Sequence, residues 1–159
     1  MSEVRVGLGI DLHPLAREGD DRPLVLGGVR FEGERGLVGH SDADAIAHAL
    51  CDAMFGAAGM GDIGEHYPDT DARFAGADSL DLLRETAARL AGEGWHLLNA
   101  DCSLVAERPR VADVRAEMMK KLSEGAGGPV HVKATRPERL GALGRLEGVA
   151  CLAVALIER

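Results

Sequence analysis

The sequence predicts an α/β protein, an α+β two-layer sandwich in which helices pack on one face of a mixed β-sheet. Segments with a two-residue apolar repeat alternate with segments that have a helical repeat, in the order β, hairpin, α, α, β, α, β, β. The chain of 159 residues has no internal repeat or low-complexity linker, so residues 1–159 are expected to form a single domain. Apolar residues make up 46% of the chain, which is enough to build one core.

The first half of the chain is expected to supply a strand, a hairpin and a helix. Residues 4–12 are interpreted as a strand, and residues 23–31 as a hairpin because Gly27 and Gly28 suit the positive φ angles of a tight turn. Ser41 and Asp44 match a capping box, which predicts a helix from Ser41 to about Phe55. Four glycines in the next segment predict a loop: Gly56, Gly59, Gly61 and Gly64.

The second half is expected to supply two helices and three strands. Asp78 is predicted to cap a helix that ends near Gly92, and a strand over residues 95–106 follows. Pro109 suits the first turn of a third helix, which residues 125–129 end before a short strand at residues 130–134. Residues 149–157 form a nearly continuous apolar strand, which we expect to be buried on both faces or against a partner subunit.

Composition and charge exclude several classes of partner. The net charge of −8 disfavours a nucleic-acid-binding protein, and the longest apolar run of nine residues is too short to span a membrane. The three cysteines are odd in number and widely spaced, and no signal peptide is visible, so a cytoplasmic protein with reduced thiols is expected. An acidic chain with 21 glycines can still bind phosphates through metals, backbone N–H groups and a few arginines.

The most specific candidate site is a metal centre. Asp11 and His13 point to the same side at the end of the first strand, although such a pair is more often incidental. His48 lies on a helix made otherwise of small and apolar residues, so it is expected to be buried and to need a partner. Two histidines and one carboxylate leave a fourth tetrahedral position open, which is typical of a reactive Zn²⁺ site.

Other polar segments have both a functional and a structural interpretation. His40 and Ser41 are expected at a helix N-terminus, where an anion is stabilised, although a simple N-cap explains Ser41 equally well. Residues 59–64 match G-x-G-x-x-G, but they follow a helix, so we reject dinucleotide binding. The carboxylates of residues 62–71 suit turns, and the hydroxyl, carboxylate and arginines of residues 135–145 suit either phosphate contacts or a charged surface turn.

Together these segments resemble the 2-C-methyl-D-erythritol 2,4-cyclodiphosphate synthase family of non-mevalonate isoprenoid biosynthesis. The resemblance covers nearly the whole chain and rests on residues 7–13, 23–28, 39–44, 61–64, 68–71, 106–110, 133–135, 144–145 and 147–148. It implies a homotrimer with active sites at the subunit interfaces. The implied reaction cyclises 4-diphosphocytidyl-2-C-methyl-D-erythritol 2-phosphate and releases CMP.

The resemblance also implies roles for individual residues. It implies that Asp11, His13 and His48 hold one Zn²⁺ per subunit, and that Glu138 holds a second divalent cation, Mg²⁺ or Mn²⁺. The catalytic residues that it implies are His40, Thr135 and Glu138. The residues that it implies for substrate binding are Asp11, His13, His40, Ser41, Asp62, Ile63, Gly64, Tyr67, Pro68, Asp69, Thr70, Asp71, Ala106, Pro109, Arg110, Thr135, Glu138 and Arg145.

The chain departs from the family pattern at Arg136, where the family usually has a threonine that contacts phosphates. We hypothesise that Arg136 replaces a neutral donor by a charged one. Ala142 and Leu146 also depart from the pattern around an axial cavity of the family trimer. Two other functions stay open: a metal-dependent phosphohydrolase on the same scaffold, and a non-catalytic trimer that binds isoprenoid diphosphates.

Overall fold

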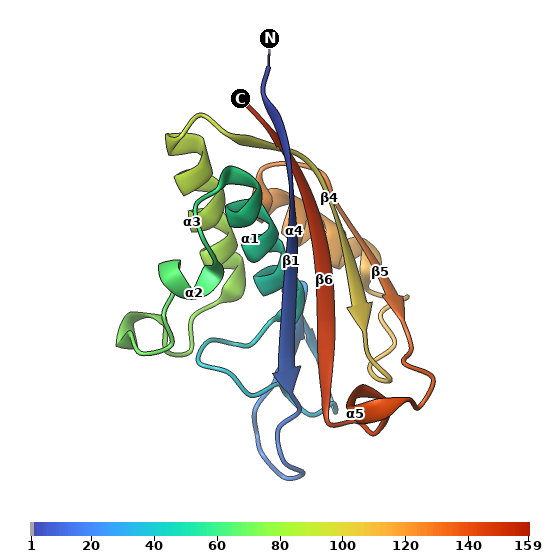
Figure 1. Ribbon diagram of the computed structural model, residues 1–159. Helices are drawn as coiled ribbons and strands as arrows, with labels where there is room; N and C mark the ends of the chain where they lie inside the picture. Colours follow the sequence, from blue (N-terminus) through green and yellow to red (C-terminus); the bar gives the residue numbers. More distant parts are fainter. Residues whose placement is uncertain (1) are drawn as a thin grey trace.

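The computed structural model describes residues 2–159, and in it a β-sheet packs against a layer of helices (Figure 1). The main sheet has the strand order β1-β6-β4-β5; β4 and β5 are parallel, and the other neighbours are antiparallel. β2 and β3 form a separate hairpin. The predicted mixed sheet is therefore confirmed. The strands are β1 (Val4–Pro14), β2 (Leu24–Leu26), β3 (Val29–Phe31), β4 (His96–Val105), β5 (Val130–Thr135) and β6 (Gly148–Glu158).

Three longer helices cover one face of the sheet, as predicted (Figure 1). α1 (Ala45–Ala58) lies between the sheet and α3 (Ser79–Gly92), and α4 (Arg115–Ala126) packs beside α3. The three short helices are α2 (Ile63–His66), the 3₁₀ helix η1 (Ala72–Phe74) and α5 (Gly141–Gly144). The sequence did not predict these three, because segments of three or four residues are too short to show a helical repeat.

β1 and α1 approach each other closely because two glycines face the helix. Gly7 and Gly9 are buried, and a Cβ atom added to Gly9 would lie 1.9 Å from the Ala49 carbonyl oxygen. At Gly7 the same atom would lie 2.1 Å from the Ala53 carbonyl oxygen. The glycines therefore set the distance between the strand and the helix.

The first helix begins at Ala45, so the predicted start at Ser41 is wrong. Ala43 has a φ of 58°, which is incompatible with a continuous right-handed helix. Asp44 is the N-cap, and its carboxylate accepts hydrogen bonds from the backbone N–H groups of Ile46 and Ala47. The carboxylate also accepts the hairpin N–H groups at positions 27 and 28, at 2.9 and 2.7 Å, so the turn and the helix share one acceptor.

The other predicted boundaries differ in accuracy. Asp78 caps α3 through a 2.8 Å bond from the Leu80 N–H, as predicted. Gly56 lies inside α1 instead of opening a loop, and the left-handed C-cap is Gly59. The third helix begins at Arg115, so the predicted start near Pro109 is wrong. Proline is compatible with the first turn of a helix but does not require one.

The face of the sheet opposite the helices is apolar and exposed along β1 and β6. Along β1 every second residue points outward, and β6 adds Leu152 and Val154, which are 40% and 44% exposed. Burial of residues 149–157 on both faces is therefore wrong for the single chain, and the alternative, burial against a partner subunit, stays a prediction. Within residues 2–159, no helix has the length and apolarity that a membrane crossing requires. The outward residues of β1 are Val4, Val6, Leu8, Ile10 and Leu12.

Candidate functional site

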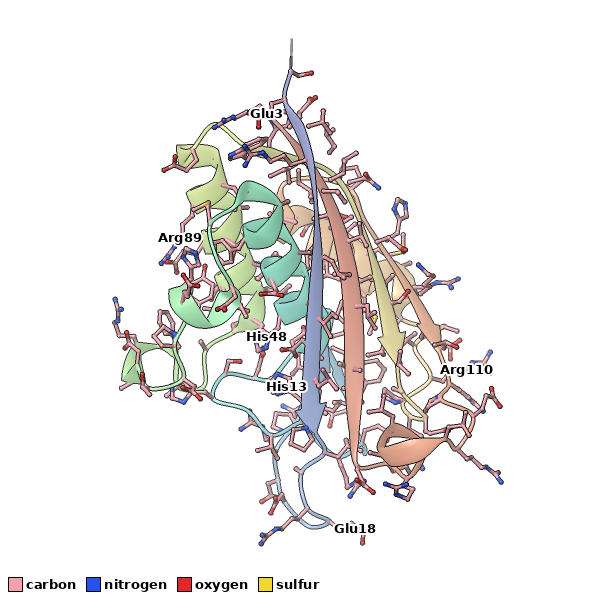
Figure 2. The ribbon with its side chains drawn as sticks, in the orientation of Figure 1. Glu3, His13, Glu18, His48, Arg89 and Arg110 are labelled. Carbon is pink, nitrogen blue, oxygen red and sulfur yellow. The ribbon has the colours of Figure 1, made fainter. Side chains whose placement is uncertain are left out.

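The three predicted metal ligands meet where the end of β1 faces the start of α1. Asp11 and His13 are two residues apart on β1, so both side chains point to the helix side. His48 is the fourth residue of α1 and points back to the strand. Figure 2 shows His13 and His48 close together at this end of the two elements.

The ligand atoms have the spacing that a small cation requires. Asp11 Oδ2 lies 3.0 Å from His13 Nε2 and 3.8 Å from His48 Nδ1. The two imidazole nitrogens are 3.1 Å apart. A tetrahedral zinc ion with bonds of about 2.0–2.1 Å holds its ligand atoms about 3.3 Å apart, within this range of distances. The three side chains therefore form a site that a single zinc-sized ion fits.

Hydrogen bonds outside the cluster orient both imidazole rings. His13 Nδ1 lies 3.0 Å from the Val38 carbonyl oxygen, which can only accept, so Nδ1 carries the hydrogen. His48 Nε2 lies 2.8 Å from the Ser79 hydroxyl oxygen. His13 Nε2 therefore turns its lone pair toward His48 Nδ1, an arrangement that a bound cation would stabilise.

Asp11 provides the clearest sign that the cluster could bind a cation. Its buried Oδ2 has no hydrogen-bond partner among the described residues, because the nearby His13 Nε2 carries no aligned hydrogen. Burial lowers the pKa of His48 and favours its neutral form. Burial has the same effect on His13, but the neighbouring Asp11 carboxylate outweighs it and raises the pKa of His13. A cation would satisfy the orphaned carboxylate oxygen.

A cleft of about 220 Å³ opens beside the cluster. It collects residues from four segments that are distant in sequence, including the predicted substrate-binding residues around Ser41 and in α2. The hydrophobic wall formed by Phe74 and Leu82 was not predicted, because neither residue belongs to a polar motif. The lining residues are His13, Gly39, His40, Ser41, His48, Ile63, Gly64, Tyr67, Asp69, Phe74 and Leu82.

The segment that carries His40 and Ser41 is held by hydrogen bonds and not by a helix. Because α1 begins at Ala45, neither residue lies at its N-terminus, so that part of the sequence prediction is wrong. Arg22 donates to the Gly39 carbonyl oxygen at 2.9 Å and to the Ser41 carbonyl oxygen. His40 Nε2 lies 3.0 Å from the Asp71 carbonyl oxygen. Arg22 was missed because nothing in the sequence relates it to this segment.

A second cleft of about 240 Å³ lies at the other edge of the sheet, where β4 and β5 end. It brings together the predicted cytidylate segment and Thr135, and it includes Arg136, the residue that departs from the family pattern. Arg110, which is labelled in Figure 2, lies near the opposite edge of the sheet from His13. The lining residues are Ala106, Glu107, Pro109, Arg110, Val111, Ala112, Arg115, Ala134, Thr135 and Arg136.

The remaining predicted site residues line neither cleft in the single chain. Asp62 caps α2 by accepting the Glu65 N–H at 2.9 Å, and Asp71 pairs with Arg73 at 2.6 Å. The side-chain hydrogen bond from Arg73 holds the pKa of Asp71 below its usual range. Arg145 pairs with Glu147 at 2.7 Å. The others outside both linings are Pro68, Thr70 and the exposed Glu138.

Comparisons with known proteins span nearly the whole chain. A sequence model of a protein family, described as the YgbB family, matches residues 4–158. A protein of Rubrobacter xylanophilus, named 2-C-methyl-D-erythritol 2,4-cyclodiphosphate synthase, is 52% identical over 162 residues, which cover 100% of this chain and 98% of that protein. A protein of Thiobacillus denitrificans with the same name is 50% identical and is covered to 99%.

Solved structures share the fold. The structure of the bifunctional IspDF from Campylobacter jejuni superposes with a TM-score of 0.92 at 39% identity and covers 99% of this chain, which spans 43% of that chain. A structure of 2C-methyl-D-erythritol-2,4-cyclodiphosphate synthase in a CDP-bound form has a TM-score of 0.85 at 36% identity. The aligned region covers 96% of this chain and 99% of the chain in that structure.

Proposed function

The chain belongs to the YgbB family, and on that premise we propose that it cyclises 4-diphosphocytidyl-2-C-methyl-D-erythritol 2-phosphate. The products are 2-C-methyl-D-erythritol 2,4-cyclodiphosphate and CMP, in non-mevalonate isoprenoid biosynthesis. The observation that carries this proposal is the cluster of Asp11, His13 and His48 beside a cleft lined by His40 and Ser41. Relatives about half identical to this chain, named for this reaction, support it.

The cluster fits the zinc ion that the family resemblance implies. Asp11 Oδ2, His13 Nε2 and His48 Nδ1 would hold the ion, and the orphaned Oδ2 is a direct reason to place a cation there. When bound, zinc supplies a Lewis acid that polarises a phosphoryl oxygen. Glu138 is proposed to hold a second divalent cation, Mg²⁺ or Mn²⁺, since an exposed carboxylate is the ligand type that such ions prefer.

The reaction is an intramolecular phosphoryl transfer. An oxygen of the 2-phosphate forms a new bond to the β-phosphorus, the bond from the β-phosphorus to the bridging oxygen breaks, and CMP leaves with that oxygen. A phosphate oxygen is already ionised near neutral pH, so the chain needs no general base to activate it. The residues of the cleft contribute by positioning the two groups and by excluding water.

The chain's own residues have distinct tasks in this scheme. His40 and Ser41 are proposed to hold the 2-phosphate and the methylerythritol end, and His40 with Thr135 and Glu138 to act in catalysis. Asp62 and Gly64 are proposed to bind the ribose, and Ile63 and residues 67–71 to contact the substrate. Residues 106–110 of the second cleft are proposed to bind the cytidylate. Thr135 and Arg145 are proposed to contact the phosphates. Structures of relatives described with bound CDP support a cytidine nucleotide as the ligand.

One chain holds these groups in two places, so we propose that the complete site forms between subunits. The metal cluster lies on β1 and the second cleft at β4 and β5, on opposite edges of the order β1-β6-β4-β5. Three inter-strand spacings separate these edges by about 14 Å. The apolar outer face of β1 and β6 supports self-association, since exposed patches of this kind mark interfaces. The family resemblance sets the number of subunits at three.

We also propose that the enzyme acts in the cytoplasm, without a nucleic-acid or membrane partner. The three cysteines are unpaired and buried, as expected for a reducing compartment. The acidic net charge of −8 would repel a polyphosphate backbone, which supports a small-molecule substrate.

The decisive experiment follows the substrate by ³¹P NMR in water enriched in ¹⁸O. The cyclase predicts CMP and a cyclic diphosphate without incorporated label, whereas a phosphohydrolase would leave label in a phosphate product. The variant His48→Ala should lose most CMP release while keeping its oligomeric state on size exclusion. Unchanged CMP release by this variant would refute the role of the cluster, whereas no CMP release by the unmodified chain would favour a binding function.

A further inference from the structure

A chain of hydrogen bonds leads from the metal cluster through the buried His48 and Ser79 to the half-buried Asp42. The Nε2 atom of His48 lies 2.8 Å from the Ser79 hydroxyl oxygen, and that hydroxyl bonds to Asp42 Oδ1. The Ser79 backbone N–H also donates to Asp42 Oδ2, at 3.1 Å. Ser79 is the first residue of α3 and is completely buried, so this contact connects α3 to the metal ligand on α1.

The chemistry of these groups fixes the direction of each bond. The Asp42 carboxylate can only accept, and it already accepts the Asp44 N–H at 3.1 Å and the Ser79 N–H. The Ser79 hydroxyl therefore donates its single hydrogen to Asp42. Its oxygen must then accept from His48 Nε2, which places the hydrogen on Nε2 and the lone pair on Nδ1. This is the tautomer that faces Asp11 and His13 as a metal ligand.

The same arrangement determines what Ser41 can do. Ser41 Oγ lies 3.1 Å from His48 Nε2 and accepts the Ala43 N–H at 3.2 Å. Because Nε2 carries a hydrogen, the Ser41 hydroxyl cannot donate to it. The hydrogen bonds of the described residues give that hydroxyl no other acceptor. Ser41 lines the first cleft, so its hydrogen is available to an anionic group bound there.

We propose that Ser79 and Asp42 are positioning residues that hold His48 in its metal-binding tautomer and ring orientation, and thereby leave the Ser41 hydroxyl free for substrate. This inference rests on the proposed function, because it needs a metal in the cluster. Its physical basis is that a histidine ligand binds more strongly when its second nitrogen donates to a fixed acceptor. Here the acceptor is a serine polarised by a carboxylate.

The test compares Ser79→Ala with Ser79→Thr and with a matched control, Ser103→Ala. Ser103 lies on β4, is half-buried, and has no side-chain hydrogen bond to a described residue. Zinc affinity is measured by competition with a chromogenic chelator, and the coordination geometry by the visible spectrum of the Co²⁺-substituted proteins. We expect Ser79→Ala to bind zinc about 10- to 100-fold more weakly with an altered Co²⁺ spectrum. Ser79→Thr should restore both, and Ser103→Ala should match the unmodified chain.

Each outcome has one meaning. If Ser79→Ala binds zinc as tightly as the unmodified chain and gives the same Co²⁺ spectrum, the inference is wrong while the proposed function stands. If the unmodified chain itself binds no zinc, the metal part of the proposed function fails and this inference fails with it. Thermal unfolding of the metal-free proteins checks the fold. If Ser79→Ala does not fold, Ser79→Cys keeps the side-chain volume, weakens the hydrogen bond and gives the same comparison.

Discussion

Adding one methyl group at Gly9 should disturb both the stability of the protein and its metal cluster. The Cβ atom of Gly9→Ala would lie 1.9 Å from the Ala49 carbonyl oxygen and 2.5 Å from the Ala53 backbone nitrogen. An ordinary van der Waals contact begins at 3.4 Å. To lengthen the distance between Cβ and the Ala49 oxygen from 1.9 Å to 3.4 Å, α1 must move away from β1 by about 1.5 Å. The obstructing atoms belong to helix backbone, so no side-chain rotation can relieve the clash.

The free-energy cost follows from this geometry. Overpacking of a close-packed core costs about 1–3 kcal/mol, and a clash with backbone belongs at the upper end, at about 3 kcal/mol. For a domain of this size that corresponds to a Tm lower by roughly 6–12 °C. The retreat of α1 also carries His48 away from Asp11 and His13. Zinc bonds tolerate little extension, so the affinity for zinc should fall at least about tenfold.

Thermal unfolding with and without zinc, and chelator competition, measure the two effects. Gly56→Ala is the matched control, because Gly56 lies on the same helix and its nearest neighbour across the gap is 4.0 Å away. That variant should gain about 0.5–1 kcal/mol from helix propensity and keep its zinc affinity. A Gly9→Ala protein that unfolds at the original temperature and binds zinc normally would show that the glycines do not set the distance between strand and helix.

Three other changes test separate features. Asp44→Ala removes the carboxylate that accepts hydrogen bonds from four backbone N–H groups. Urea unfolding should show a free energy of unfolding lower by about 3–5 kcal/mol, and a decrease below about 1 kcal/mol would contradict the shared cap. Burial raises the pKa of Cys51 and Cys102 to about 12, so both thiols should react slowly with a disulfide reagent at pH 8. Thiols of the unfolded chain ionise at about pH 8.5, so the free energy of unfolding should fall as the pH rises from there towards 12. A free energy that does not change over this pH range would argue against burial as the cause of the raised pKa values. Arg136→Thr should keep turnover, whereas Arg136→Ala should reduce it; an Arg136→Ala enzyme with unchanged kcat and KM would remove Arg136 from the phosphate contacts.

The parts of the site that were predictable from sequence depend on local geometry. Asp11 and His13 share a side because strand side chains alternate with period two, and this relation holds wherever the strand lies in the fold. His48 was predictable because a histidine within a run of small and apolar residues must be buried. The assignment of residues 106–110 to the cytidylate depended on family resemblance, because their composition indicates no ligand.

Contacts between distant segments account for what the sequence did not predict. The helix begins at Ala45 and not at the predicted Ser41, because the N-cap Asp44 also accepts hydrogen bonds from hairpin N–H groups 16 and 17 residues earlier. Ser79 meets His48 across 31 residues only because α3 packs on α1. Neither contact has a sequence periodicity of its own, so neither could be found before the fold was known.

The pairing of β1 with β6 makes the protein suited to circular permutation. Val4 pairs with Glu158 and Pro14 with Gly148, so both outer strand ends lie together, and Glu3 and Arg159 exchange backbone hydrogen bonds of 2.9 and 3.0 Å. The metal cluster lies at the other end of this 11-residue strand, roughly 30 Å away. A short peptide bridge between residues 3 and 159, with new ends opened in the exposed segment 17–21, would reorder the polypeptide without touching either cleft.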